Sequence, residues 1–189
     1  MSLLTLSLLI IAAVQGPSTA DNVRGSLSIS RQVYCRGDVK GDFLQLFVRI
    51  RLHNMTGRPL VVPPRVSVGR VIVSDVDGAK DPASLLFSMT PESLSSDNPD
   101  PSTYNVLPAG KTVTFQTSTV VPVTRSTTTH DVLGPGRHWL MLEVSPPVRS
   151  SLGGHYENLA RKGDVWTSPV RVGGTSFQVD PRYTVKDCK

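Results

Sequence analysis

Apolar and polar residues alternate along the chain, most clearly over Phe43–His53. Every second residue of FLQLFVRIRLH is apolar, and Gln45, Arg49 and Arg51 lie between them. A period of two is that of a β-strand with one buried face and one wet face, as in an antiparallel sheet. Similar short segments follow, separated by turn residues. The pattern predicts strands at Ser26–Cys35, Phe43–His53, Leu60–Val62, Val66–Ser74, Leu85–Met89, Thr112–Thr117 with Val120–Val123, His138–Val144, Trp166–Val172 and Thr175–Val179.

The first of these segments alternates less regularly than the second. Leu27, Ile29, Val33 and Cys35 share one face of a strand if Arg31 lies at an edge. No segment has the apolar spacing of a helix of normal length, although LARKG suits one helical turn. The sequence therefore predicts an all-β fold, an antiparallel β-sandwich of about 7–9 strands. A long polar insertion at residues 145–163 precedes the last strands.

Composition agrees with a strand-rich fold. Val and Thr are abundant, while Ala, Glu and Lys are sparse, and β-branched side chains favour pleated sheets. Fifteen glycines and fifteen prolines suit many turns. The 189 residues are enough for one domain with a proper core.

The N-terminus has the pattern of a secretory signal. An apolar run at Leu3–Val14 is followed by the small residues Ser18, Thr19 and Ala20, although no Lys or Arg precedes the run. The run is shorter than the ~20 residues that cross a bilayer. We therefore expect a signal peptide at 1–20, a single domain at 21–189, no membrane insertion and a secreted or periplasmic location.

The two cysteines, Cys35 and Cys188, fit an oxidising compartment. An even number of cysteines in an exported chain favours a disulfide. The alternative is a pair of free thiols. Metal binding is not favoured because no CxxC pair is present.

Three later segments resemble a known class of domain. They are LPAGKTVTF, LGPGRHWLMLEV and WTSPVRV with SFQV, and they are similar to bacterial immunoglobulin-like β-sandwich domains. The domain shared with the intracellular proteinase inhibitor family is one such relative. The resemblance covers Phe43–Val179 and implies an immunoglobulin-like sandwich. The signal peptide departs from an intracellular inhibitor, and no reactive-site loop can be placed.

The formal net charge is +5, and arginine dominates the basic residues. They are scattered along the sequence, without a Lys/Arg run and without interleaved aromatic residues. No nucleic-acid partner is therefore predicted. The interpretations left open are solubility with weak affinity for anionic surfaces, and a true surface for polyanions or acidic glycans.

Several short motifs have both a functional and a structural interpretation. Asp75, Asp77 and Asp81 surround a turn and suit either a calcium ion or a plain hairpin, which we favour, so no metal is predicted. Arg36-Gly37-Asp38 is an adhesion tripeptide or a turn. Asn54-Met55-Thr56 is an N-glycosylation acceptor or a turn.

No catalytic constellation is evident in the sequence. The four histidines, His53, His130, His138 and His155, form no HExxH motif and no closely spaced pair, and 126–131 is expected to be a polar loop. We therefore predict no catalytic residue, no cofactor and no enzymatic activity.

Three aromatic residues form a candidate ligand or partner patch. Phe47, Trp139 and Trp166 are its members, and exposed rings on a sheet can stack sugars or bind a partner. The alternative is that the 145–163 insertion covers them. The leading prediction is thus an exported, non-enzymatic binding or structural module with a protein or glycan partner. The alternatives are a secreted proteinase inhibitor, acting through Thr90–Thr103 or Ser145–Gly163, and an exported hydrolase.

Overall fold

The structure is a computed structural model that describes residues 22–37, 41–75, 85–89, 100–125, 132–146 and 152–188. The described chain is almost entirely β-structure, so the predicted all-β class is confirmed. The predicted signal peptide at 1–20 lies outside the described residues. The strands are β1 Val23–Cys35, β2 Phe43–Asn54, β3 Leu60–Val62, β4 Ser67–Ser74, β5 Leu85–Met89, β6 Asn105–Leu107, β7 Thr112–Pro122, β8 Gly136–Ser145, β9 Asp164–Val165 and β10 Val170–Val179; the helices are η3 Pro101–Thr103 and α2 His155–Ala160.

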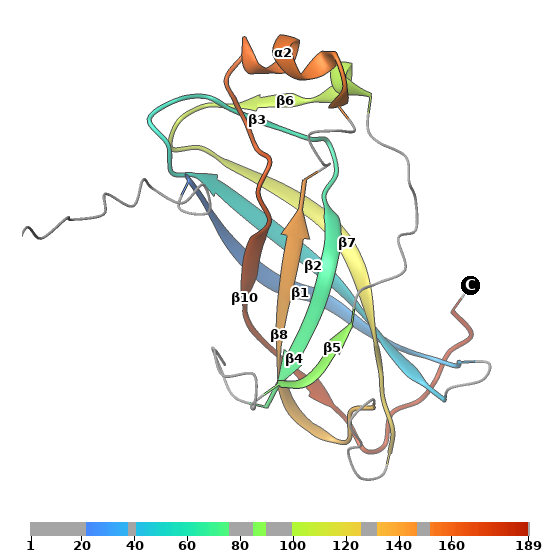
Figure 1. Ribbon diagram of the computed structural model, residues 1–189. Helices are drawn as coiled ribbons and strands as arrows, with labels where there is room; N and C mark the ends of the chain where they lie inside the picture. Colours follow the sequence, from blue (N-terminus) through green and yellow to red (C-terminus); the bar gives the residue numbers. More distant parts are fainter. Residues whose placement is uncertain are drawn as a thin grey trace, which may run out of the picture.

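Two larger sheets face each other, and a small third sheet lies at one end with α2 above it (Figure 1). The first sheet has the order β1-β2-β7, and the second has the order β10-β8-β4-β5. Their strand pairs are antiparallel. The third sheet, β6-β3-β9, includes the parallel pair β3–β9. This arrangement is the predicted sandwich.

The core lies between the two larger sheets. The alternating apolar residues of β2 face those of β8, and members such as Leu44, Leu46 and Leu142 are fully buried. Each buried leucine contributes about 1.5–3 kcal/mol relative to an exposed one. The alternation seen in the sequence of Phe43–His53 is therefore the alternation between core and solvent.

A β-bulge in β1 overturns one prediction. Ile29 pairs with Val48, but Arg31 pairs with Phe47, so Ser30 is an extra residue. One inserted residue transfers every later side chain to the other face of the strand. Val33 consequently pairs with the outward-facing Gln45, and the prediction that Leu27, Ile29, Val33 and Cys35 share one face is wrong.

The insertion before the last strands contains the short helix α2 and covers the third sheet. Leu152 and Leu159 pack against Val61 and Tyr104 in a second apolar cluster. The described part of the insertion thus closes one end of the sandwich, above β3 and β6 (Figure 1).

The C-terminal segment is fixed to the end of β1. Cys35 and Cys188 form the predicted disulfide, across 153 residues of sequence. Backbone hydrogen bonds join Lys186 to Tyr34 and Arg36, and the rings of Tyr34 and Tyr183 stack 4.4 Å apart.

Among the described residues, no helix has the length and apolar composition that a bilayer span requires.

Candidate functional site

The outward side of the β1-β2-β7 sheet carries four exposed arginines. Arg49 and Arg51 project from β2, and Arg24 and Arg31 project from β1 beside them. The three strands contain no Asp or Glu at any position. We call this side of the sheet the arginine face, and it comprises these four residues with Ser26, Ser28, Phe47, His53, Thr112, Thr114, Gln116 and Ser118.

Strand pairing sets the spacing of the four cations. Directly opposed residues form levels across the sheet, and β2 supplies one residue to each level at positions 47, 49, 51 and 53. Arg31 lies opposite Phe47, and Arg24 lies opposite His53. Each level therefore holds one arginine. Successive levels are two residues apart, about 7 Å, so the series extends over about 20 Å.

The guanidinium of Arg31 lies over the ring of Phe47, with the Arg31 Cζ atom 4.0 Å from the ring centroid. The hydroxyl of Ser30 donates a hydrogen bond of 3.1 Å to the carbonyl oxygen of Phe47 and so ties the bulge to β2. Stacking covers one planar side of a guanidinium and leaves its edge N–H groups able to donate to a carboxylate or sulfate. Phe47 is half-buried, and this arginine covers its ring.

None of the four arginines forms an ion pair with any residue that the structure describes. The ion pairs of the described chain are Arg58–Asp164 at 3.2 Å and Arg171–Glu143 at 3.5 Å. On the other large sheet, Glu143 lies between Arg171 and Arg70 in the register, so positive and negative charges alternate there. The two outer faces of the sandwich therefore differ in charge, and only the arginine face is uniformly cationic.

A groove borders the arginine face where β1 meets β10. A cavity of about 440 Å³ is lined by Arg24, Gly25, Glu143 and Arg171, among others. A second cavity of about 310 Å³ adjoins it through Val23 and reaches Tyr156, Asp164 and Trp166. The first cavity contains both arginine and glutamate side chains, and the charged side chain of the second is Asp164, so neither is uniformly cationic like the arginine face.

The structure does not bring the three predicted aromatic residues together. Phe47 lies on the arginine face, and Trp139 is half-buried on the outward side of β8 in the opposite sheet. Trp166 is 4% exposed and belongs to the core. The three rings thus form no common surface, and the described insertion covers the third sheet instead of Phe47 or Trp139.

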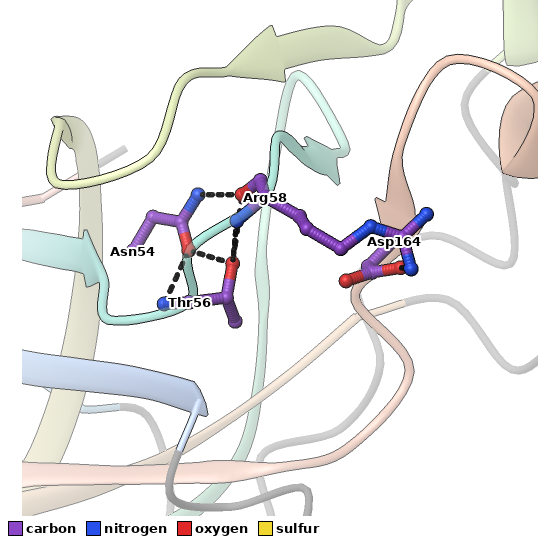
Figure 2. Close-up of polar contacts among 4 residues, drawn as sticks. All are labelled: Asn54, Thr56, Arg58 and Asp164. Atoms are coloured by element: carbon purple, nitrogen blue, oxygen red, sulfur yellow. Dashed lines mark hydrogen bonds and ion pairs between the residues drawn. The ribbon is translucent and has the colours of Figure 1, made fainter.

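Asn54 is a structural residue of the β2–β3 turn. Its side chain is fully buried, and its amide nitrogen donates to the carbonyl oxygens of Arg58, Leu107 and Pro108 at 2.9–3.2 Å. Its oxygen accepts from the backbone N–H and the hydroxyl of Thr56 at 2.9 and 2.7 Å, as Figure 2 shows. A glycan on this nitrogen would replace these bonds, so the folded structure supports the turn interpretation of Asn54-Met55-Thr56.

Arg58 connects the same turn to the third sheet. Its guanidinium pairs with the Asp164 carboxylate at the start of β9 (Figure 2). Both side chains are well exposed, so this pair adds at most about 1 kcal/mol.

The other short motifs do not assemble into a site among the described residues. Asp75 is exposed at the end of β4, while Asp77, Asp81 and the Asp38 of the Arg-Gly-Asp tripeptide lie outside the described chain. No group of three metal-ligating side chains occurs within the described ranges.

The described histidines lie on separate elements. His53 contacts the Thr112 hydroxyl at 3.0 Å on the arginine face, and buried His138 contacts the Gly134 carbonyl oxygen at 3.0 Å. His155 begins α2, and His130 lies outside the described residues. Among the described residues, no hydrogen bond joins any of these histidines to a carboxylate.

Tyrosines account for the pKa shifts near the core. Burial is the largest cause that raises the pKa of Tyr34, Tyr104 and Tyr183. At Tyr183, the hydrogen bond to the Asp42 carboxylate raises the pKa further. Each shift favours the neutral phenol in the folded protein and gives no group suited to proton transfer near neutral pH.

The arginine face was missed from the sequence because its residues look scattered along the chain. Strand pairing brings Arg24 and Arg31 beside Arg49 and Arg51. The available signal was the absence of acidic residues from all three segments, read together with the period of two. Arg31 could not have been placed in this way, because simple alternation assigns it to the core side.

Comparison with known proteins adds no functional information. No protein-family model matches the chain, and no curated protein matches it either. One solved structure, described as the X-ray structure of Northeast Structural Genomics Consortium target SoR45, is similar with a TM-score of 0.36 and 8% sequence identity. The similarity covers 91% of this chain and 97% of that one, and it carries no argument about function.

Proposed function

We propose that this protein is an exported, non-enzymatic binding module that holds anionic partners on its arginine face. The observation that carries the proposal is the series of four exposed arginines on β1 and β2, in a sheet whose three strands contain no acidic residue. A uniform cationic surface attracts anions and repels other cations, which provides both selectivity and a faster encounter.

The sheet also favours binding through its rigidity. β2 is hydrogen-bonded to a neighbour on each side, so the backbone beneath Arg49 and Arg51 is held in place. A single exposed ion pair contributes only about 0–1 kcal/mol. Several such pairs on a preorganised surface add to a useful affinity without the cost of ordering a loop.

The remaining parts of the proposal rest on sequence. The signal-like residues 1–20 and the Cys35–Cys188 disulfide support a secreted or periplasmic location. The resemblance over Phe43–Val179 supports an immunoglobulin-like form of the sandwich. Proteinase inhibition and hydrolysis remain alternatives, and neither is favoured by a specific observation in the described residues.

The proposal is tested with two double variants that remove the same number of charges. Arg49→Gln/Arg51→Gln alters the arginine face, whereas Arg137→Gln/Arg161→Gln removes exposed arginines of β8 and of the turn after α2. We expect the face variant to leave a sulfonate-bearing resin at clearly lower salt than the control variant. If both variants leave the resin at the same salt concentration, binding follows net charge alone and the proposal is overturned.

A further inference from the structure

We infer that the partner of the arginine face is a linear acidic polysaccharide, lying along β2 with its carboxylate or sulfate groups on successive arginines. This inference rests on the proposed function and specifies its ligand class. Three features of the face carry it: the order of the cations with one at each level, the hydroxyl-rich surface between them, and the aromatic ring covered by Arg31.

The order of the cations favours a repeating polymer over a compact anion. Arg31, Arg49, Arg51 and Arg24 occupy four successive levels, one at each level. A single phosphate or a small dianion would need several cations converging on one point. A series with a step of about 7 Å instead matches a chain that presents a negative charge at regular intervals.

The surface around the arginines is suited to sugar hydroxyls. Ser26, Ser28, Thr114, Gln116 and Ser118 are exposed on neighbouring strands at the same levels. Hydroxyl and amide side chains both donate and accept hydrogen bonds, as the neutral hydroxyls of a glycan require.

The same surface is poorly suited to an acidic protein partner. Protein interfaces are built around a buried core of apolar and aromatic residues. On the described sheet, the exposed large apolar residue is Val120, which lies beyond the four levels, opposite Gln45. Apart from the Phe47 ring, which Arg31 covers, charged and polar groups therefore define the face.

Single-stranded nucleic acid is also disfavoured. Proteins that bind it combine basic grooves with aromatic side chains on which the bases stack. Phe47 supplies the one phenyl ring of the four levels, and Arg31 lies over it. The ring thus orients a guanidinium and leaves no platform for a base.

Arg31 is the positioning residue of the series. The bulge at Ser30 transfers its side chain to the outer face, where its guanidinium lies over the Phe47 ring. A planar fork held in one orientation binds a carboxylate or sulfate through two parallel hydrogen bonds. Lysine has the same charge but lacks the fork, so Arg31→Lys separates geometry from charge.

The test measures binding of labelled probes to the full chain at several salt concentrations. Oligogalacturonates of increasing length carry one carboxylate per sugar, and dextran sulfate carries sulfates, so the two arms distinguish the anionic group. Neutral dextran, polyglutamate and oligothymidylate represent the excluded ligand classes. We expect acidic glycans to bind most tightly, with affinity rising until the oligomer spans about 20 Å.

The variants define the site. Each of Arg24→Gln, Arg31→Gln, Arg49→Gln and Arg51→Gln should weaken glycan binding about two- to fivefold and make binding less sensitive to salt. Arg31→Lys should fall between Arg31→Gln and the unaltered protein, and Arg137→Gln/Arg161→Gln should bind as the unaltered protein does. Thermal unfolding of each variant verifies that it is folded.

Two outcomes would overturn the inference, and they differ in what they imply for the proposed function. If polyglutamate or oligothymidylate binds the face more tightly than either acidic glycan, the ligand class is wrong and anionic binding stands. If no anionic probe binds above neutral dextran, both proposals fail.

Discussion

Asn54 shows how much a single side chain contributes to this fold. Its buried side chain forms hydrogen bonds with three carbonyl oxygens and with the hydroxyl and N–H of Thr56 at the β2–β3 turn. The sequence identified Asn54 as a turn residue or a glycosylation acceptor, but could not decide between them. The choice depends on Leu107 and Pro108, more than fifty residues away, whose carbonyl oxygens no local pattern places beside Asn54.

We expect Asn54→Ala to lower the free energy of unfolding by about 1–3 kcal/mol, because it removes a fully buried amide and takes this donor away from the buried Leu107 carbonyl oxygen. Urea denaturation measures the change. Arg58→Gln is the matched control, since it removes only an exposed ion pair of the same turn and should cost less than about 1 kcal/mol. A loss for Asn54→Ala no larger than that of the control would contradict the structural role.

Burial of tyrosine predicts a loss of stability in alkaline solution. The pKa values of Tyr34, Tyr104 and Tyr183 are raised on folding, so the folded state keeps its phenols protonated more strongly than the unfolded state does. Their contribution is complete below the unfolded pKa of about 10, and it is lost as the pH rises through the folded values.

Tyr104→Phe isolates one of these groups. The Tyr104 hydroxyl is buried and has no hydrogen-bond partner among the described residues. We therefore expect the variant to be at least as stable as the unaltered protein near neutral pH and to lose less stability above about pH 10. Urea denaturation at several pH values provides the comparison. If the variant loses as much unfolding free energy above about pH 10 as the unaltered protein does, the prediction is wrong.

At the scale of elements, the sequence predicted the long strands and the short strands β3 and β5, but it missed β6 and β9. The alternation of Phe43–His53 corresponds to β2 almost residue for residue. Two predicted strands, Trp166–Val172 and Thr175–Val179, overlap a single strand, β10, which begins only at Val170. Its register shifts at Gly174, a glycine with φ of 83°. Strand β6 is three residues long and strand β9 is two residues long, which is too short for a periodic pattern to be visible in the sequence.

The close approach of β1 to β10 gives a testable pairwise contact. Gly25 faces the core, and a Cβ atom there would overlap the Cγ1 atom of the fully buried Val172. We expect Gly25→Ala to destabilise the protein by about 1–3 kcal/mol through overpacking.

Val172→Ala should relieve this overlap while creating a cavity of its own. The double variant should therefore lose clearly less stability than the two single variants added together. Chemical denaturation of the four proteins gives the coupling free energy. Additive losses would mean that the sheets separate to accommodate the methyl group, and that the contact is not rigid.

For the whole molecule, the disulfide joins the first strand to the last described residues. The bridge between Cys35 and Cys188 encloses almost all of the described fold. Its pairing was predicted from the sequence because only two cysteines exist. The difference in charge between the two outer faces was not predicted, because the charge of a face depends on which strands pair and on where the register shifts.

Removing the bridge should lower stability substantially. A loop of 153 residues corresponds to about 5 kcal/mol in the chain-entropy model, and observed losses are typically about 2–5 kcal/mol. Cys35→Ser/Cys188→Ser can be compared with the oxidised protein by urea denaturation. The Tyr34–Tyr183 stack gives the C-terminal segment a second attachment, so native β-structure should persist in dilute buffer, as circular dichroism would show.

The bulge at Ser30 also has a consequence for how such a surface changes over evolutionary time. If the bulge were lost while Ser30 remained in the chain, Ser30 would pair with Phe47, and Arg31 would turn from solvent to the level of Leu46 in the core. A cation would disappear from the face although every arginine codon remained. Loss of the Ser30 codon, by contrast, would place Arg31 directly after Ile29 and leave it opposite Phe47. Among relatives of this chain, the presence of the bulge should therefore track changes of ligand at least as closely as arginine substitutions do.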